Sequence, residues 1–144
     1  MPQSKVGVLW RWMLLSLRQA AWAPVAVLTI HVVASVGWNI YHWLPDFDIP
    51  MHFAGGLAIA YFFGGCYRVA MQFGLLGSPS QVVYPLTVFG LTCAAAVVWE
   101  FAEFLADHRF GIRSQTSLAD TLLDLLMGML GGIVLLMWQY KRWP

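Results

Sequence analysis

The stretch LADTLLDLLMGMLGGIVLLMWQ, residues 118 to 139, decides the fold of this chain. Its only charged residues are Asp120 and Asp124, and almost everything after them is apolar. A helix of about 20 apolar residues crosses the hydrocarbon core of a bilayer, which is roughly 30 Å thick. Backbone groups in lipid must be satisfied within the segment, and this stretch is longer than a barrel strand and lacks its alternation. The sequence therefore predicts a transmembrane helix with two carboxylates near its start.

Three further stretches have the same apolar character, at about 23–44, 50–73 and 82–105. The chain of 144 residues is 60% hydrophobic and only 10% charged, whereas a soluble domain carries about 25% charged residues. The connections between the four stretches are short, and no tract resembles a linker. We therefore expect an all-α integral membrane protein, a four-helix bundle that forms a single domain over residues 1–144.

Basic residues are distributed unevenly about these spans. Six of the eight Lys and Arg residues fall on one side, and the other two, Arg109 and Arg113, fall in the loop before residue 118. The positive-inside rule assigns the richer side to the cytoplasm, so both termini are expected there. All seven acidic residues then belong to the outer side: Asp46, Asp48, Glu100, Glu103, Asp107, Asp120 and Asp124. Nucleic-acid binding is not expected, because no basic patch exists beyond these ordinary cytoplasmic cations.

Residues 5–20, KVGVLWRWMLLSLRQA, combine tryptophans and leucines with three cations. This mixture is typical of an amphipathic helix in the membrane interface, where long cationic side chains reach toward water. A cleaved signal peptide is the alternative, because Ala21-Trp22-Ala23 resembles a cleavage site. Arg11 and Arg18 interrupt and follow an already short apolar region, which favours an interfacial helix on the inner side.

Ionisable residues form three pairs near the outer ends of the predicted spans. Each pair is spaced by three or four residues, which puts both members on one side of a helix. Because the second and fourth spans begin at the outer face and the third ends there, we expect all six side chains in one layer. The pairs are Asp48 with His52, Glu100 with Glu103, and Asp120 with Asp124.

Helix capping is the alternative for some of these residues. Asp48 precedes Pro50 and is suited to start the second span, and Asp120 follows Ser117 in a capping-box spacing. Asp124 lies one turn too deep for a cap, and Glu100 lies near a helix C-terminus, where the macrodipole disfavours an anion. Asp124 and Glu100 are therefore the stronger candidates for a functional site, because capping does not explain them.

The chemistry follows from what keeps the carboxylates from repelling one another. A hard divalent cation is one answer, because carboxylate oxygens with one imidazole suit Mg²⁺, Mn²⁺, Fe²⁺ or Zn²⁺. Protonation is a second answer, since burial in a membrane favours neutral carboxyl groups that can move protons. Ion pairing with Arg109 and Arg113 is the third, although two cations cannot neutralise so many anions. His52 by itself fits a packed histidine as well as a ligand or proton carrier.

Two other polar residues belong near this layer. Gln115, just before the fourth span, is suited either to bind a substrate or to order the loop. His31 lies near the middle of the first span, where a histidine usually faces the bundle interior. It either extends a polar path inward from the outer layer or makes a single interhelical hydrogen bond.

Three motifs carry a family resemblance: FDIPMHFAGG (47–56), WEFAE (99–103) and QTSLADTLLDLLMGMLGG (115–132). Together they resemble the small bacterial inner-membrane proteins called YjdF-like and, more distantly, the VanZ-like group. The resemblance implies a multi-pass protein of the bacterial inner membrane, and the VanZ-like likeness implies work on the cell envelope. The site residues that it implies are Asp48, His52, Glu100, Glu103, Gln115, Asp120, Asp124 and Gly128.

Our leading hypothesis is an outer-facing site where Asp48, His52, Glu100, Glu103, Asp120 and Asp124 bind a divalent metal. There the protein would recognise or hydrolyse a lipid or envelope precursor, with Glu100 or Glu103 as the catalytic base. The alternative is a non-enzymatic component: a proton or cation pathway, or an accessory subunit of a larger membrane complex. A membrane-protein partner or a homo-oligomer is compatible with either hypothesis.

Overall fold

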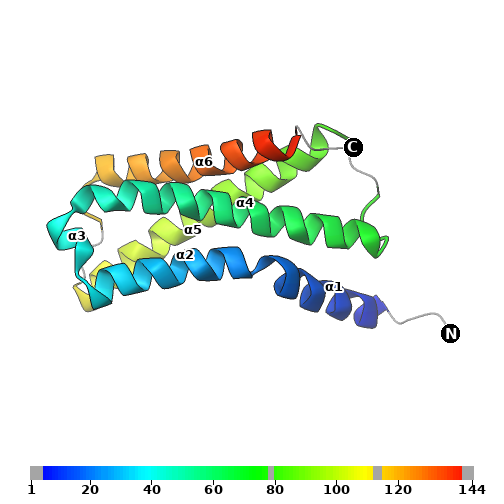
Figure 1. Ribbon diagram of the computed structural model, residues 1–144, viewed down its shortest axis with the longest axis horizontal. Coiled ribbons are helices and arrows are strands. Elements are labelled where there is room, and N and C mark those ends of the chain that lie inside the picture. The colour runs from blue at the N-terminus through cyan, green and yellow to red at the C-terminus, as the bar shows by residue number, and fades with distance from the viewer. Residues whose placement is uncertain (1–4, 78–79, 112–114, 141–144) are drawn as a thin grey trace.

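The computed structural model describes residues 5–77, 80–111 and 115–140, and its regular elements are all helical (Figure 1). The long helices are α1 (Lys5–Ala20), α2 (Trp22–Val32), α4 (Asp48–Gln72), α5 (Val83–Phe110) and α6 (Leu118–Tyr140). Between α2 and α4 lie a π-helical turn, η1 (Val33–Gly37), the short helix α3 (Ile40–Trp43) and a 3-10 turn, η2 (Pro45–Phe47).

Three helical segments are long and apolar enough to cross a membrane: Pro45–Gln72, Val83–Phe110 and Leu118–Gln139. They coincide in position with the second, third and fourth predicted spans. The third helix continues beyond the predicted end at residue 105 and stops at Gly111, whose φ of 65° is left-handed. Glycine adopts this conformation without a steric penalty and commonly ends helices.

The first predicted span, 23–44, is wrong as a continuous helix. The helix that starts at Trp22 ends at Gly37, and Asn39 follows it with a left-handed φ of 51°. Glycine weakens a helix interior, and asparagine is one of the few residues that tolerate this backbone conformation. The segment Trp22–Gly37 passes the span test only together with Lys5–Ala20, from which it is bent by 53°. Among the described residues, three helices are therefore long and apolar enough to cross a membrane, or four if this bent pair is one span.

The N-terminal helix α1 packs against α4. Ser16 and Ala20 are buried, and the indole N–H of Trp12 donates a hydrogen bond of 2.9 Å to the Cys66 carbonyl oxygen. A Cβ added to Gly65 would lie only 2.6 Å from the Cβ of Ala20, so the two backbones approach closely. The sequence predicted an interfacial helix over residues 5–20, and these contacts fasten that helix to one end of α4. Its place in the membrane interface stays a prediction.

Helix α4 is the centre of the fold and lies between α6 and the α1–α2 pair (Figure 1). Its contact with α6 is the most extensive of the helix contacts. A Cβ on Gly56 would overlap the carbonyl oxygen of Gly128, and a Cβ on Gly131 would overlap that of Phe53. Small residues let transmembrane helices approach in this way, because association in lipid depends on close packing.

The α4–α6 contact generates a first prediction. Gly56→Ala should lower the free energy of unfolding by about 1–3 kcal/mol, because the added methyl group has no space beside the Gly128 carbonyl. Gly90→Ala is the matched control, since a Cβ there meets no atom within 4 Å. Unfolding of the detergent-solubilised protein measures both. Equal stability of the two variants would contradict the close contact.

Candidate functional site

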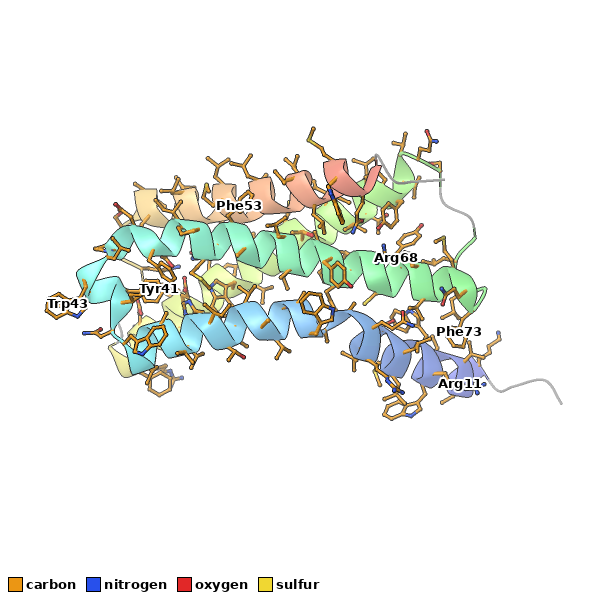
Figure 2. All side chains as sticks on the ribbon, in the orientation of Figure 1. Arg11, Tyr41, Trp43, Phe53, Arg68 and Phe73 are labelled. Carbon is orange, nitrogen blue, oxygen red and sulfur yellow. The ribbon has the colours of Figure 1, made fainter. Side chains whose placement is uncertain are left out.

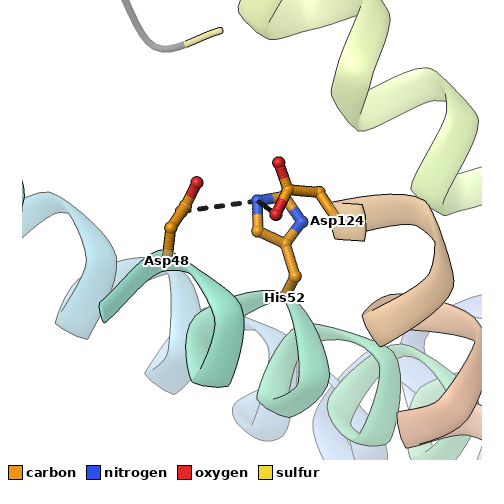
Figure 3. A group of neighbouring side chains, drawn as sticks. All are labelled: Asp48, His52 and Asp124. Atoms are coloured by element: carbon orange, nitrogen blue, oxygen red, sulfur yellow. Dashed lines mark ion pairs between the residues drawn. The ribbon is translucent and has the colours of Figure 1, made fainter. Parts of the chain in front are cut away.

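His52 occupies the centre of a group of carboxylates from three helices. Its Nε2 atom lies 3.4 Å from Asp48 Oδ1 and 3.7 Å from Asp124 Oδ1, and its Nδ1 atom lies 3.7 Å from Glu100 Oε1. Figure 3 shows the imidazole between Asp48, one turn before it on α4, and Asp124 from α6. Both ring nitrogens of His52 therefore face acidic partners.

The acidic side chains of this group are withdrawn from the surface. Glu100 is 6% exposed, Glu103 9% and Asp124 4%. Two sets of side chains, Asp48–His52–Asp124 and His52–Glu100–Glu103, each offer ligand atoms within 4.8 Å of one another. We call these five residues, Asp48, His52, Glu100, Glu103 and Asp124, the carboxylate/histidine cluster.

A layer of small residues lies one helical turn deeper than the cluster. Gly56 follows His52 by four residues, and Gly128 follows Asp124 by four. On α5, which runs in the opposite direction, Ala96 precedes Glu100 by four residues. A Cβ on Gly128 would lie 3.5 Å from the Ala96 Cβ and 3.9 Å from the His52 carbonyl oxygen. The close packing of this layer brings the three helices together beneath the charged side chains.

Gln115 fastens the chain before α6 to the end of α5. Its side-chain N–H groups donate to the Glu100 carboxylate and to the Glu100 carbonyl oxygen, each at 3.0 Å. Its backbone N–H donates to Asp107 Oδ2 at 2.8 Å. Gln115 therefore links the segment before α6 to the end of α5 and holds the Glu100 carboxylate in the cluster. Which of its two predicted roles applies stays a prediction.

Asp120 belongs to neither set of close ligand atoms. Its Oδ2 atom accepts hydrogen bonds from the backbone N–H and the hydroxyl of Thr116, at 3.0 and 2.8 Å. Its own N–H donates to the Ser117 hydroxyl at 3.1 Å. These contacts are typical of a helix start, as the capping alternative expects.

His31 lies beside the cluster on α2. Its Nδ1 atom is 2.7 Å from the Tyr41 hydroxyl, and its ring packs edge-on against Trp99 at 5.6 Å. Burial, with the charges of Asp48 and Glu103, raises the pKa of Tyr41 and keeps its phenol neutral. The neutral phenol retains a proton to share with His31.

Tyr41 and Trp99 were missed as neighbours of the site by sequence reasoning. Trp99 lies one turn before Glu103 on α5, and its ring contacts that of His31. The spacing of four residues from Glu103 was the signal that could have identified Trp99. Tyr41 had no such signal, because its approach depends on the break in the helix after Gly37.

Each ion pair of the cluster joins His52 to one of the cluster's own carboxylates. In the described ranges, no Lys or Arg side chain forms an ion pair with Asp48, Glu100 or Asp124. Of the two arginines considered as partners, Arg113 lies outside the described residues. Four carboxylates around one imidazole therefore leave an excess of acidic groups, and the arrangement is suited to a cation.

Comparison with known proteins gives a family match. Residues 6–143 match the family described as "Predicted membrane protein (DUF2238)", in agreement with the YjdF-like resemblance. A protein of Thermotoga maritima, described as uncharacterized, is 32% identical over 105 residues. The alignment covers 71% of this chain and 52% of the relative, so the chain spans about half of the relative's length. No solved structure matches the chain.

The contacts of Gln115 generate a second prediction. Gln115→Leu should lower the free energy of unfolding by about 1–3 kcal/mol, because the buried Glu100 carboxylate loses a donor. Gln81→Leu is the matched control, since Gln81 is exposed outside the long helices. Unfolding in the same detergent measures both variants. If Gln115→Leu lowers the free energy of unfolding no more than Gln81→Leu does, the Gln115 side chain does not stabilise this end of α5.

Proposed function

The chain belongs to the DUF2238 family of predicted membrane proteins, and we propose that its carboxylate/histidine cluster binds a divalent cation at the outer face of a bacterial inner membrane. There the protein binds or hydrolyses a lipid or envelope precursor. One observation carries the proposal: ligand atoms from α4, α5 and α6 lie within 4.8 Å of one another in two sets that share His52. Carboxylate oxygens with an imidazole suit Mg²⁺, Mn²⁺, Fe²⁺ or Zn²⁺.

The cost of charge inside a membrane supports this proposal. An ionised side chain at the centre of a bilayer costs about 2.5–3.5 kcal/mol on insertion scales, so such residues need a partner. His52 alone cannot neutralise Asp48, Glu100, Glu103 and Asp124. A divalent cation would supply the missing positive charge and would draw the ligand atoms closer than their present separations.

The chemistry available to an enzyme follows from the same residues. A bound cation would activate a water molecule or polarise a phosphoryl oxygen of the substrate. Glu100 and Glu103 are the residues proposed as the catalytic base. Gln115 holds Glu100 through one carboxylate oxygen, while the other oxygen faces His52.

The proposed orientation places both termini in the cytoplasm, as the positive-inside rule favours. Figure 2 shows Arg11 and Arg68 toward one end of the molecule and Tyr41 toward the other. Tyr41 lies at the end that carries the cluster, because its hydroxyl contacts His31 beside Trp99. The cluster and these basic side chains are therefore at opposite ends, which supports an outward-facing site.

A proton or cation pathway is the second candidate function. The contact between Tyr41 and His31 favours it, because it continues the polar groups of the cluster toward α2. Deeper in the bundle the walls become apolar, with Gly55, Ile59 and Ala95 in place of ionisable groups. This change in polarity favours the cation site as the leading proposal.

A matched pair of substitutions on α6 tests the cation site. Asp124→Asn should weaken cation binding at least about tenfold, because it removes a ligand of the cluster. Asp120→Asn, one turn earlier, should leave binding unchanged, since Asp120 caps the helix. Metal analysis of purified protein equilibrated with Mn²⁺ or Zn²⁺ measures both variants. Wild-type protein that binds neither ion, or equal loss in the two variants, would overturn the proposal.

A flux measurement separates the second candidate from the first. Wild-type protein in liposomes should give no pH-dependent ion flux if the cluster is a resident cation site. A flux that Asp124→Asn and Glu100→Gln both abolish, without a change in metal content, would instead establish the pathway.

A further inference from the structure

An apolar cavity of about 220 Å³ lies directly beneath the carboxylate/histidine cluster. His52 belongs to the cluster and also lines the cavity, so the two are continuous. From His52 the cavity follows α4 as far as Ile59, a rise of about 10 Å along the helix axis. The site therefore has a charged outer part and an apolar inner part.

The walls of the cavity come from four helices. Aliphatic side chains of α2 and α4 line it, including Val27, Met51 and Ile59. Small residues make the space: a Cβ on Gly55 would meet no atom within 4 Å, and Ala95 contributes only a methyl group from α5. An apolar cavity of about 150 Å³ stays free of water and takes up benzene in a soluble protein. This larger apolar cavity is likewise suited to hydrocarbon.

The cavity adjoins a loosely packed seam between α2 and α5. Among the described residues, α2 packs on α4, and α5 packs on α4 and α6, whereas α2 and α5 are not a closely packed pair. The rings of His31 and Trp99 meet across this seam and also line the cavity. In a bilayer, the hydrocarbon available beside this seam is the acyl chains of phospholipids.

From this arrangement we infer that the cavity receives one acyl chain of a membrane phospholipid whose phosphate lies at the cluster. The polarity matches a lipid of the outer leaflet, with its head group outward and its chain directed into the membrane. The position of the phosphate rests on the proposed cation site, because an anion beside four carboxylates requires a bridging cation. The acyl chain requires only the cavity.

Crosslinking from within the bilayer tests this inference. The full chain is reconstituted in phosphatidylethanolamine and phosphatidylglycerol vesicles that contain phosphatidylglycerol with a diazirine on the middle of one acyl chain. After irradiation, mass spectrometry should find adducts on Ile59 in the wild-type protein, because it lines the inner part of the cavity. Gly55→Leu should reduce these adducts about tenfold, because the new side chain fills the cavity.

Gly55→Leu has a matched control, and a second pair of variants repeats the comparison from α5. Gly90→Leu adds the same side chain at an exposed position of α5 where a Cβ also meets no atom, and it should leave the adducts unchanged. Ala95→Leu fills the cavity from α5 and should act like Gly55→Leu, whereas Ala94→Leu on the exposed side should not. The second pair keeps the test decisive if Gly55→Leu fails to fold.

The metal content of the same samples separates this inference from the proposed function. Gly55→Leu should lose the adducts and keep its bound Mn²⁺, since no cluster ligand changes. Wild-type protein that holds Mn²⁺ but gives no adducts on Ile59 would overturn the acyl-chain inference alone. Equal adducts in the cavity-filling and control variants would do the same, because they would report labelling from the outer surface.

Discussion

The close approach of α4 and α6 at Gly56 and Gly128 is the constraint on which the site depends. A glycine on each helix lets backbone meet backbone, and the charged residue four positions earlier is then carried to the same height. His52 and Asp124 meet in this way at 3.7 Å. On α5, which runs in the opposite direction, the small residue Ala96 comes four positions before the charged residue Glu100. A layer of small residues thus aligns a layer of ionisable ones, because the helical repeat links them.

Polarity changes sharply over a short depth of this bundle. In one layer Asp48, Glu100 and Asp124 surround one imidazole, and in the neighbouring layer the walls are aliphatic and small. The same residues make both features possible: glycine and alanine bring the helices together at one level and leave space beside them. Such an arrangement is suited to an amphipathic molecule rather than to a continuous polar path. This is the physical reason to favour a lipid-linked function over transport.

The break in the first predicted span also contributes to the site. Because the helix ends at Gly37 and Asn39 is left-handed, α3 turns back and brings Tyr41 to His31 on α2. Hydropathy averaged over the whole of residues 23–44 did not reveal this break, because the apolar residues before Gly37 outweigh the more polar ones after it. Glycine and asparagine were visible in the sequence, but both also occur inside transmembrane helices, and neither dictates a stop by itself.

The sequence by itself determined the properties that depend on local composition and helical period. It predicted the membrane class, the last three of four spans, the gathering of acidic residues at one end, and the pairing of Asp48 with His52 on one face of α4. Tertiary structure decided which residues meet across helices. It placed Asp124 against His52 and engaged Asp120 in a helix cap, although the two aspartates are only one turn apart. Rotation and depth of one helix against another depend on where backbones can touch, and that depends on the facing surface, which no single stretch of sequence contains.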